Sequence, residues 1–249
     1  MSKYYSISPQ LYDDQFWWKK DDIEFWKSEL LKTSTKKILE LGAGTGRLAG
    51  PLAKEGADYT GIDISKDYVR YAQHTFLKVK HVKFIEANMI NFNLKKNFDY
   101  IFIGFNSFLH LMKNKDAYRC LKSIKNHMHA TSKFFIDIFV PHPLILHRPE
   151  NIRLHILDFY NNNAQKEQSI TELLTYNPKN EIADIEWCYT NNDGSIDNKF
   201  IFKMKMYYPD TMNKIIIDSG FKIIDFWGSY EKTNFTENSN LQIYKCQLV

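Results

Sequence analysis

Short apolar runs alternate with amphipathic segments through the first half of the chain. The runs are bounded by polar residues and predict strands at 38–41, 59–62, 82–86, 100–105 and 133–139. The segments between them place apolar residues three and four positions apart, which predicts helices at 23–30, at 47–55, after Ser65 and from Asn114. Alternation of helices with nearly all-apolar strands is typical of a parallel sheet that helices cover on both faces.

The pattern changes after Pro141. Several alternating, β-rich runs follow between residues 154 and 208, with a turn at Asn192–Gly194, and they predict an antiparallel layer inserted late in the domain. A helix at 209–220 and two strands, at 221–227 and 241–248, are expected to end the chain. We therefore expect one α/β domain, 1–249, that carries the insertion 154–208.

Composition narrows the classes of protein that fit this pattern. With 249 residues, of which 44% are apolar, the chain can bury a sizeable core. Its net charge is only +4 and its basic residues are scattered, so a nucleic-acid partner is not indicated. The three cysteines form no C-x-x-C pair and no metal-ligand spacing, which predicts reduced, buried thiols and no metal site. The segment Met1–Tyr5 lacks an apolar core and no run of about 18 apolar residues occurs, so we expect a cytoplasmic protein without a membrane segment.

A glycine-rich segment between two predicted strands carries the strongest functional signal. An apolar run that contains Glu40 is followed by three glycines at alternate positions, Gly42, Gly44 and Gly46. Such glycines allow positive φ and let a ligand approach where a Cβ would block it. A dinucleotide fingerprint has the spacing G-x-G-x-x-G, but Arg47 occupies the position of its last glycine. The carboxylate of Glu40 would repel a pyrophosphate and suits a ligand that carries an ammonium group.

This segment resembles the first motif of the class I S-adenosylmethionine-dependent methyltransferases. The resemblance extends over nearly the whole chain and implies a Rossmann-like seven-stranded sheet with one antiparallel strand near its edge, and S-adenosylmethionine as the cofactor. It also implies that the loop binds this cofactor through Glu40, Gly42, Ala43, Gly44 and Gly46. Asp63, which ends the second predicted strand, matches the acid that binds the ribose in this family, and Ile64 is expected to pack on the adenine.

Asn88 and Met89 follow the third predicted strand, at a place where the family usually has Asp instead of Asn88. The amide oxygen of Asn88 can still accept a hydrogen bond from the adenine amino group, so both residues are candidates for the adenine site. The alternative is that Asn88 is an ordinary residue of the turn between a strand and a loop.

The fourth predicted strand leads into a segment that contains Phe105, Ser107 and His110. Here the chain is similar to small-molecule N-methyltransferases, because glycine N-methyltransferase and the aminosugar N,N-dimethyltransferases have a similar Ser-x-x-His at this place. The resemblance implies that Phe105 lies at the cofactor, that His110 faces the reaction centre and that the inserted layer 154–208 covers the active site. Because histidine titrates near neutral pH, His110 can take the proton of an acceptor or orient its amine. The alternative is a histidine that only holds the backbone beneath the cofactor.

Tyr12, within Gln10–Asp13, matches a Tyr-Asp pair that the aminosugar enzymes have near their substrate. The resemblance implies that its phenol orients an amine or contacts the methionyl end of the cofactor. The aromatic residues that follow support an alternative, in which the segment covers the site as apolar surface; they are Phe16, Trp17 and Trp18.

Together these features predict an enzyme that methylates a small molecule, with an amine as the favoured acceptor. The chain lacks the Asn/Asp-Pro-Pro-aromatic signature of enzymes that methylate adenine or glutamine amino groups, and it lacks the Pro-Cys pair of cytosine C5 chemistry. O-methylation of a small molecule and non-catalytic binding of S-adenosylmethionine remain alternatives. The sequence leaves the identity of the acceptor and the oligomeric state open.

Overall fold

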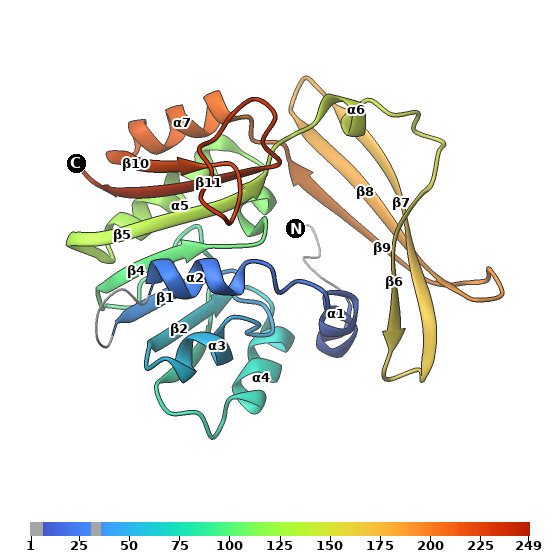
Figure 1. The fold of residues 1–249 in the computed structure, drawn as a ribbon, viewed down its shortest axis with the longest axis horizontal. Coiled ribbons are helices and arrows are strands. Elements are labelled where there is room, and N and C mark those ends of the chain that lie inside the picture. Colours follow the sequence, from blue (N-terminus) through green and yellow to red (C-terminus); the bar gives the residue numbers. More distant parts are fainter. Residues whose placement is uncertain (1–6, 31–35) are drawn as a thin grey trace. The chain divides into compact units, whose positions relative to one another are not determined.

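Seven strands form one mixed sheet in the computed structural model, which describes residues 7–30 and 36–249 (Figure 1). The strand order is β10-β11-β5-β4-β1-β2-β3, and β11 runs antiparallel to both of its neighbours. The strands are β1 Lys37–Leu41, β2 Asp58–Asp63, β3 Val82–Glu86, β4 Phe98–Ile103, β5 Met128–Phe139, β10 Phe221–Trp227 and β11 Leu241–Leu248. The predicted seven-stranded sheet with one antiparallel strand near its edge is confirmed. The segment Met1–Tyr5 lies outside the described residues.

The chain divides into two compact units, which we call the seven-stranded unit and the four-stranded unit. The first comprises residues 21–140 and 207–249, and the second comprises the residues up to Lys20 together with 141–206. The helices of the seven-stranded unit are α2 Ile23–Leu30, α3 Ala49–Lys54, α4 Lys66–Thr75, the 3₁₀ turn η1 Ser107–His110, α5 Asn114–Lys125 and α7 Pro209–Asp218. The four-stranded unit has α1 Pro9–Gln15 and α6 Pro143–Leu146. Within the described ranges, none of these helices combines the length and apolar character that a membrane span requires.

The connections between parallel strands explain where the helices lie. The chain passes from β1 through α3 to β2 and through α4 to β3, and then crosses back to β4, from which it passes through α5 to β5 in the opposite direction. Because such crossovers are right-handed, α3 and α4 lie on one face of the sheet and α5 lies on the other. The change of direction falls between β1 and β4, and α/β sheets bind ligands at the carboxyl ends of the strands at this point.

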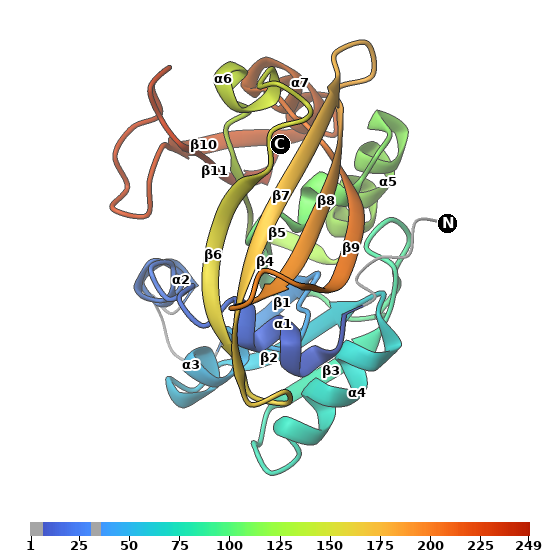
Figure 2. The same ribbon diagram turned by 90° about the vertical axis from the view of Figure 1, so that its right-hand side faces the viewer.

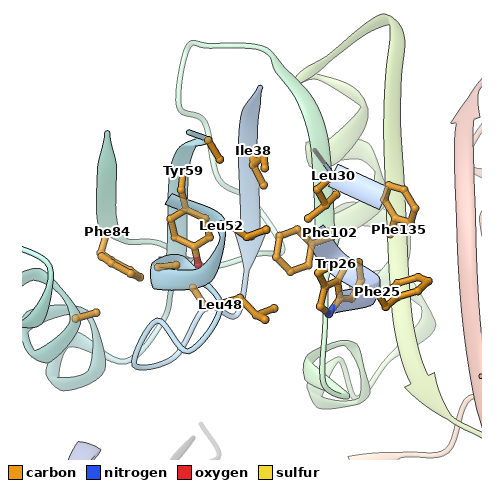
Figure 3. Close-up of a cluster of buried hydrophobic side chains, with 14 of the residues drawn as sticks. Phe25, Trp26, Leu30, Ile38, Leu48, Leu52, Tyr59, Phe84, Phe102 and Phe135 are labelled. Atoms are coloured by element: carbon orange, nitrogen blue, oxygen red, sulfur yellow. The ribbon is translucent and has the colours of Figure 1, made fainter. Parts of the chain in front are cut away.

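An aromatic core holds α2 and α3 against the sheet (Figure 3). The fully buried ring of Trp26 in α2 lies 4.6 Å from the ring of Phe102 and 6.1 Å from that of Phe135, measured between centroids. Leu48 and Leu52, from the start of α3 and from the helix itself, belong to the same buried cluster. An aromatic side chain of this kind buries roughly 150–250 Å². The cluster therefore fixes the strands from which the functional loops depart.

The four-stranded unit is an antiparallel sheet in the order β6-β7-β8-β9 (Figure 2). Its strands are β6 Leu154–Asn161, β7 Lys166–Asn177, β8 Ile182–Asn191 and β9 Ile196–Lys205. Helix α1 belongs to this unit because the hydroxyl of Tyr189 in β8 donates to Oε1 of the buried Gln15 at 2.7 Å. In addition, the Asp14 carboxylate accepts hydrogen bonds from the backbone and side-chain nitrogens of Asn162. The predicted antiparallel layer is confirmed as a sheet.

Most predicted elements are present, and three strands, β3, β10 and β11, have the predicted bounds. Two strands differ. β4 ends at Ile103 and not at residue 105, because Phe105 leaves the extended conformation with a φ of 48°. β5 begins at Met128, five positions before the predicted start at 133, because its early residues pair with β4 across a register shift.

All three cysteines are free and buried, as predicted. Cys120 lies in α5, Cys246 in β11 and Cys188 in β8. Burial raises the pKa of each thiol, and a hydrogen bond to Glu186 adds to the shift at Cys188. The thiols therefore behave as small apolar core groups.

Candidate functional site

The glycine loop leaves the carboxyl end of β1, next to the turn that follows β4. Its glycines have positive φ angles of 72° at Gly42, 55° at Gly44 and 89° at Gly46. A Cβ on Gly42 would lie 2.8 Å from the Cβ and the Oγ of Ser107, so both the conformation and the space exclude a side chain there. Ala43, between Gly42 and Gly44, is buried. The loop therefore presents backbone rather than side chains at the end of the sheet where ligands bind.

Asp63 at the end of β2 supports this loop. Its Oδ2 accepts a hydrogen bond from the backbone nitrogen of Gly44 at 2.9 Å, and its Oδ1 accepts one from that of Ser65 at 2.8 Å. Burial raises the pKa of the Asp63 carboxyl above its usual value, and the hydrogen bonds from backbone N–H groups offset only part of this shift. Because each carboxylate oxygen has a further lone pair, Asp63 can also accept the two ribose hydroxyls. The side chain of Ile64 is 46% exposed, which leaves apolar surface free next to the acid.

Glu40 is buried, although the sequence suggests that its carboxylate is available to a ligand. Its carboxyl is buried in the seven-stranded unit and accepts a short hydrogen bond from the hydroxyl of Tyr59, which lies on the neighbouring strand β2. Burial raises the pKa of Glu40 to about 8, while the bond from Tyr59 and the charge of Arg47 act in the opposite direction. Direct contact of Glu40 with the ammonium group of a cofactor stays a prediction. No local pattern in the sequence predicts the pairing with Tyr59.

Asn88 and Met89 follow the end of β3. The side-chain oxygen of Asn88 accepts from the backbone nitrogen of Ile90 at 2.9 Å, which is the bond of an ordinary turn residue. A second lone pair of that oxygen remains for an adenine amino group, so both roles that the sequence suggests are compatible with this geometry. The Cε of Met89 lies 3.4 Å from the place that a Cβ on Gly42 would occupy, so Met89 borders the glycine loop.

The segment after β4 brings His110 to the same end of the sheet. Phe105 and Asn106 both have positive φ, 48° and 65°, and η1 begins immediately afterwards at Ser107. The Oγ of Ser107 lies 3.4 Å from the carbonyl oxygen of Gly42, to which it donates. His110 is the last residue of η1 and is half-buried, whereas the two residues before it are fully buried. The structure thus places Phe105 and His110 in the same unit as the glycine loop and Asp63.

Tyr12 belongs to the four-stranded unit, where it lies in α1. Its ring packs edge-on against that of Phe16, with 4.8 Å between centroids, and Phe16 in turn lies 6.3 Å from the ring of Trp187 in β8. Both the role of Tyr12 toward an acceptor and the alternative of an apolar cover remain predictions.

Arg47 and Asp22 form an ion pair that the sequence did not predict. The Arg47 guanidinium donates to both carboxylate oxygens of Asp22 at 2.7 Å, and the side chain of Asp22 is completely buried. The indole nitrogen of Trp26 donates to the same carboxylate at 3.3 Å, and the guanidinium lies 5.6 Å from the ring centroid of Phe105. The pair therefore ties the glycine loop to the start of α2. The only sequence signal was the position of Arg47 directly after Gly46.

These residues fit S-adenosylmethionine. A glycine turn leaves space for a ligand against the backbone, a partly shielded carboxylate stands at the end of β2 for the ribose, and exposed apolar surface lies beside it at Ile64. The three features lie at the carboxyl ends of adjacent parallel strands, as the binding rule for such sheets requires.

The comparisons with known proteins agree with this assignment. Residues 38–130 match the protein-family model described as a methyltransferase domain, and this range includes the glycine loop, Asp63 and His110. A protein of Geobacillus sp. (strain WCH70), provisionally named a methyltransferase, is 28% identical over 108 residues, which are 43% of this chain and 44% of that protein. YqeM of Bacillus subtilis (strain 168), also provisionally named a methyltransferase, is 29% identical over 89 residues, 35% of this chain and 36% of YqeM. The matched region thus spans less than half of either relative.

Solved structures share the fold over most of their length. The CcbJ methyltransferase from Streptomyces caelestis superposes with a TM-score of 0.79 at 16% identity, over 92% of this chain and 88% of CcbJ. An S-adenosylmethionine-dependent methyltransferase from Clostridium acetobutylicum superposes with a TM-score of 0.76 at 18% identity, over 96% of both chains. The glycopeptide N-methyltransferase MtfA, in complex with S-adenosylmethionine, gives 0.60 at 16% identity, over 91% of this chain and 92% of MtfA. Residues 38–130 therefore match a methyltransferase domain, and the chain shares its fold with S-adenosylmethionine-dependent methyltransferases.

Proposed function

We propose that this protein transfers a methyl group from S-adenosylmethionine to the nitrogen of a small-molecule amine. The observation that carries the proposal is the meeting of the glycine loop, Asp63 and the turn that bears His110 at the carboxyl ends of β1, β2 and β4. In this arrangement the cofactor-binding groups and a candidate base share one compact unit.

The protein's part in cofactor binding follows from the contacts above. Asp63 accepts the ribose hydroxyls, the backbone of Gly42–Gly46 receives the methionyl part, and Ile64, Asn88 and Met89 border the adenine. When bound, the cofactor supplies a methyl group on a sulfonium, which a neutral nucleophile can attack in line. Holding the reacting groups in line contributes most of the rate enhancement, since positioning can lower a barrier by roughly 7–11 kcal/mol.

His110 is the residue that we assign to the acceptor's proton. Its imidazole is half-buried at the end of η1, and the burial of Phe108 and Leu109 fixes the backbone that carries it. A histidine in this position can accept the proton that the amine loses, or hold the amine with its lone pair directed at the methyl group. Such general-base assistance is worth on the order of a hundredfold in turnover.

A cavity within the four-stranded unit has a lining that suits a small amine. Its volume is about 440 Å³, and acidic and aromatic side chains predominate in its lining. The carboxylates and partly exposed rings are those of Asp13, Asp14, Asp158, Glu167, Trp17 and Tyr160. Carboxylates attract an ammonium group, and aromatic faces add cation–π attraction. We therefore assign the choice of acceptor to the layer 154–208 together with the segment around Tyr12.

The test is a turnover screen of small amines and hydroxyl compounds with S-adenosylmethionine, repeated with His110→Ala. We expect methylation of an amine, and a loss of about a hundredfold in kcat for His110→Ala with cofactor affinity nearly unchanged. His74→Ala, which removes an exposed histidine of α4, is the matched control and should retain full turnover.

The dependence of kcat on pH distinguishes the two acceptor classes. An amine must itself be neutral to attack, so the rising limb should persist in His110→Ala and move toward the pKa of the amine. With a hydroxyl acceptor, the rising limb would follow the ionisation of His110 and would therefore disappear in His110→Ala. Methylation of hydroxyl compounds alone would contradict the proposed amine, and the absence of any turnover despite cofactor binding would contradict catalysis altogether.

A further inference from the structure

Two consecutive residues with positive φ connect β4 to η1. Phe105 has a φ of 48° and Asn106 a φ of 65°, and neither is glycine. A bulky aromatic residue rarely adopts this conformation, and where it does, surrounding contacts hold it there. The turn therefore requires partners that compensate for its strain.

Asp137, near the end of β5, supplies several of these partners. Its Oδ2 accepts from the backbone nitrogen of Phe105 at 3.1 Å, and its carbonyl oxygen accepts from that of Asn106 at 3.1 Å. The side chain of Asn106 also bonds to this strand, because its Oδ1 accepts from the backbone nitrogen of Phe139 at 2.8 Å. Asp137 is only 1% exposed, so it acts on the turn from within the protein.

Tyr230 supports Asp137 from a distant part of the chain. It lies in the loop between β10 and β11, and its hydroxyl donates to the same Oδ2 of Asp137 at 2.8 Å. Its ring packs 5.6 Å from that of Phe25 in α2. This packing leaves the hydroxyl of Tyr230 directed at the carboxylate that holds the turn.

The turn controls two features of the candidate site. Ser107, the next residue, is in contact with Gly42 of the glycine loop, and His110 follows three positions later. At the far end of this short segment, the hydroxyl of Tyr207 donates to the carbonyl oxygen of Leu111 at 2.6 Å. The segment is therefore fixed at both ends, and Asp137 holds the end that joins β4.

We propose that Asp137 and Tyr230 are positioning residues that set the place of His110 by holding the strained turn at Phe105 and Asn106. The proposal rests on the proposed function of His110 as the group that handles the acceptor's proton. Neither residue needs to touch the cofactor or the acceptor for this effect.

The principal test is Tyr230→Phe, which removes one hydroxyl and retains the ring that packs on Phe25. We expect kcat to fall about tenfold, because a small misplacement of a catalytic group is costly, while cofactor affinity changes less than twofold. Tyr118→Phe is the matched control: it also removes a phenol that donates to a carboxylate, that of Asp218, but in the helices α5 and α7. It should retain full turnover.

A double-mutant cycle shows whether Tyr230 acts through His110. If it does, Tyr230→Phe should cost little further turnover in the His110→Ala background, because the group that it positions is already gone. Equal losses in both backgrounds would show that Tyr230 acts only on the fold, and would overturn the proposal.

Amide hydrogen exchange provides a readout that does not depend on activity. Tyr230→Phe should speed exchange at residues 105–111 and leave the rest of the described chain unchanged, whereas Tyr118→Phe should not. Unchanged exchange at 105–111 would overturn the proposal even if activity fell. If no acceptor is found, or if His110→Ala keeps full turnover, the function assigned to His110 fails while the exchange experiment still decides whether Tyr230 holds the turn.

Discussion

Asp63 is the residue on which cofactor binding should depend most. Its carboxylate accepts two backbone N–H groups and has lone pairs left for two hydroxyls of a ribose. Asp63→Ala should weaken binding of S-adenosylmethionine by about 1.5–3 kcal/mol, as expected for hydrogen bonds to a charged group. Calorimetry measures this directly, with Asp67→Ala as a control that removes an exposed carboxylate in the first turn of α4. Equal affinities in wild type and Asp63→Ala would rule out the ribose contact.

Glu40 should make stability depend on pH. Its pKa is raised from 4.5 to about 8, so between these values the folded state binds a proton that the unfolded state does not. The free energy of unfolding therefore falls as pH rises through this window and levels off above it. Glu40→Gln should remove this pH dependence. As pH rises across the window, the free energy of unfolding of the variant should therefore increase relative to that of the wild type by up to about 1.4 kcal/mol per pH unit.

Denaturant unfolding between pH 5 and pH 9 checks this prediction. Glu86→Gln removes an exposed carboxylate at the end of β3 and should give a curve parallel to that of the wild type. Parallel curves for wild type and Glu40→Gln would mean that Glu40 is ionised throughout.

At the scale of elements, the junction of the glycine loop with the turn after β4 should tolerate no side chain. Gly42→Ala meets two costs, a φ of 72° and a Cβ that would lie 2.8 Å from Ser107. Gly56→Ala has a φ of 89° but no atom within 4 Å of the new Cβ, so it measures the conformational cost alone. We expect Gly42→Ala to be the more destabilising by about 1–3 kcal/mol and to weaken cofactor binding, whereas Gly56→Ala leaves binding unchanged. Thermal unfolding measures the stability of both variants and calorimetry measures their cofactor affinity. If the junction were loosely packed, Gly42→Ala and Gly56→Ala would have equal effects.

The elements also show what local patterns can and cannot predict. Periodicity predicts β3, β10 and β11 with their bounds because buried strands and turns leave local signals. It extends β4 too far, since the apolar run continues through Phe105 and only contacts from Asp137 and Asn106 turn the backbone there. The motif at Glu40–Gly46 predicts the glycine loop, whereas the bond between Glu40 and Tyr59 depends on strand register, which no local pattern encodes.

At the scale of the whole molecule, the sequence predicts the antiparallel layer but not which other elements belong to the same unit. The β-rich composition of 154–208 predicts a separate sheet, while the inclusion of α1 in the same unit depends on bonds across more than a hundred residues, from Tyr189 to Gln15 and from Asn162 to Asp14. Such contacts have no sequence signature. The placement of this layer over the active site accordingly stays a prediction.

The buried cysteines make it possible to measure how fast each of the two units opens. Cys188 lies in the four-stranded unit, whereas Cys120 and Cys246 lie in the seven-stranded unit, and all three are fully buried. A thiol reagent should therefore label the native protein only slowly, when a unit opens transiently, and should label all three thiols rapidly in denaturant. Under native conditions we expect Cys120 and Cys246 to be labelled at one common rate and Cys188 at another, which mass spectrometry of the labelled peptides would resolve. Different rates for Cys120 and Cys246 would show that the seven-stranded unit opens in parts, so the kinetics of labelling would reveal the cooperative boundaries of the molecule without any substitution.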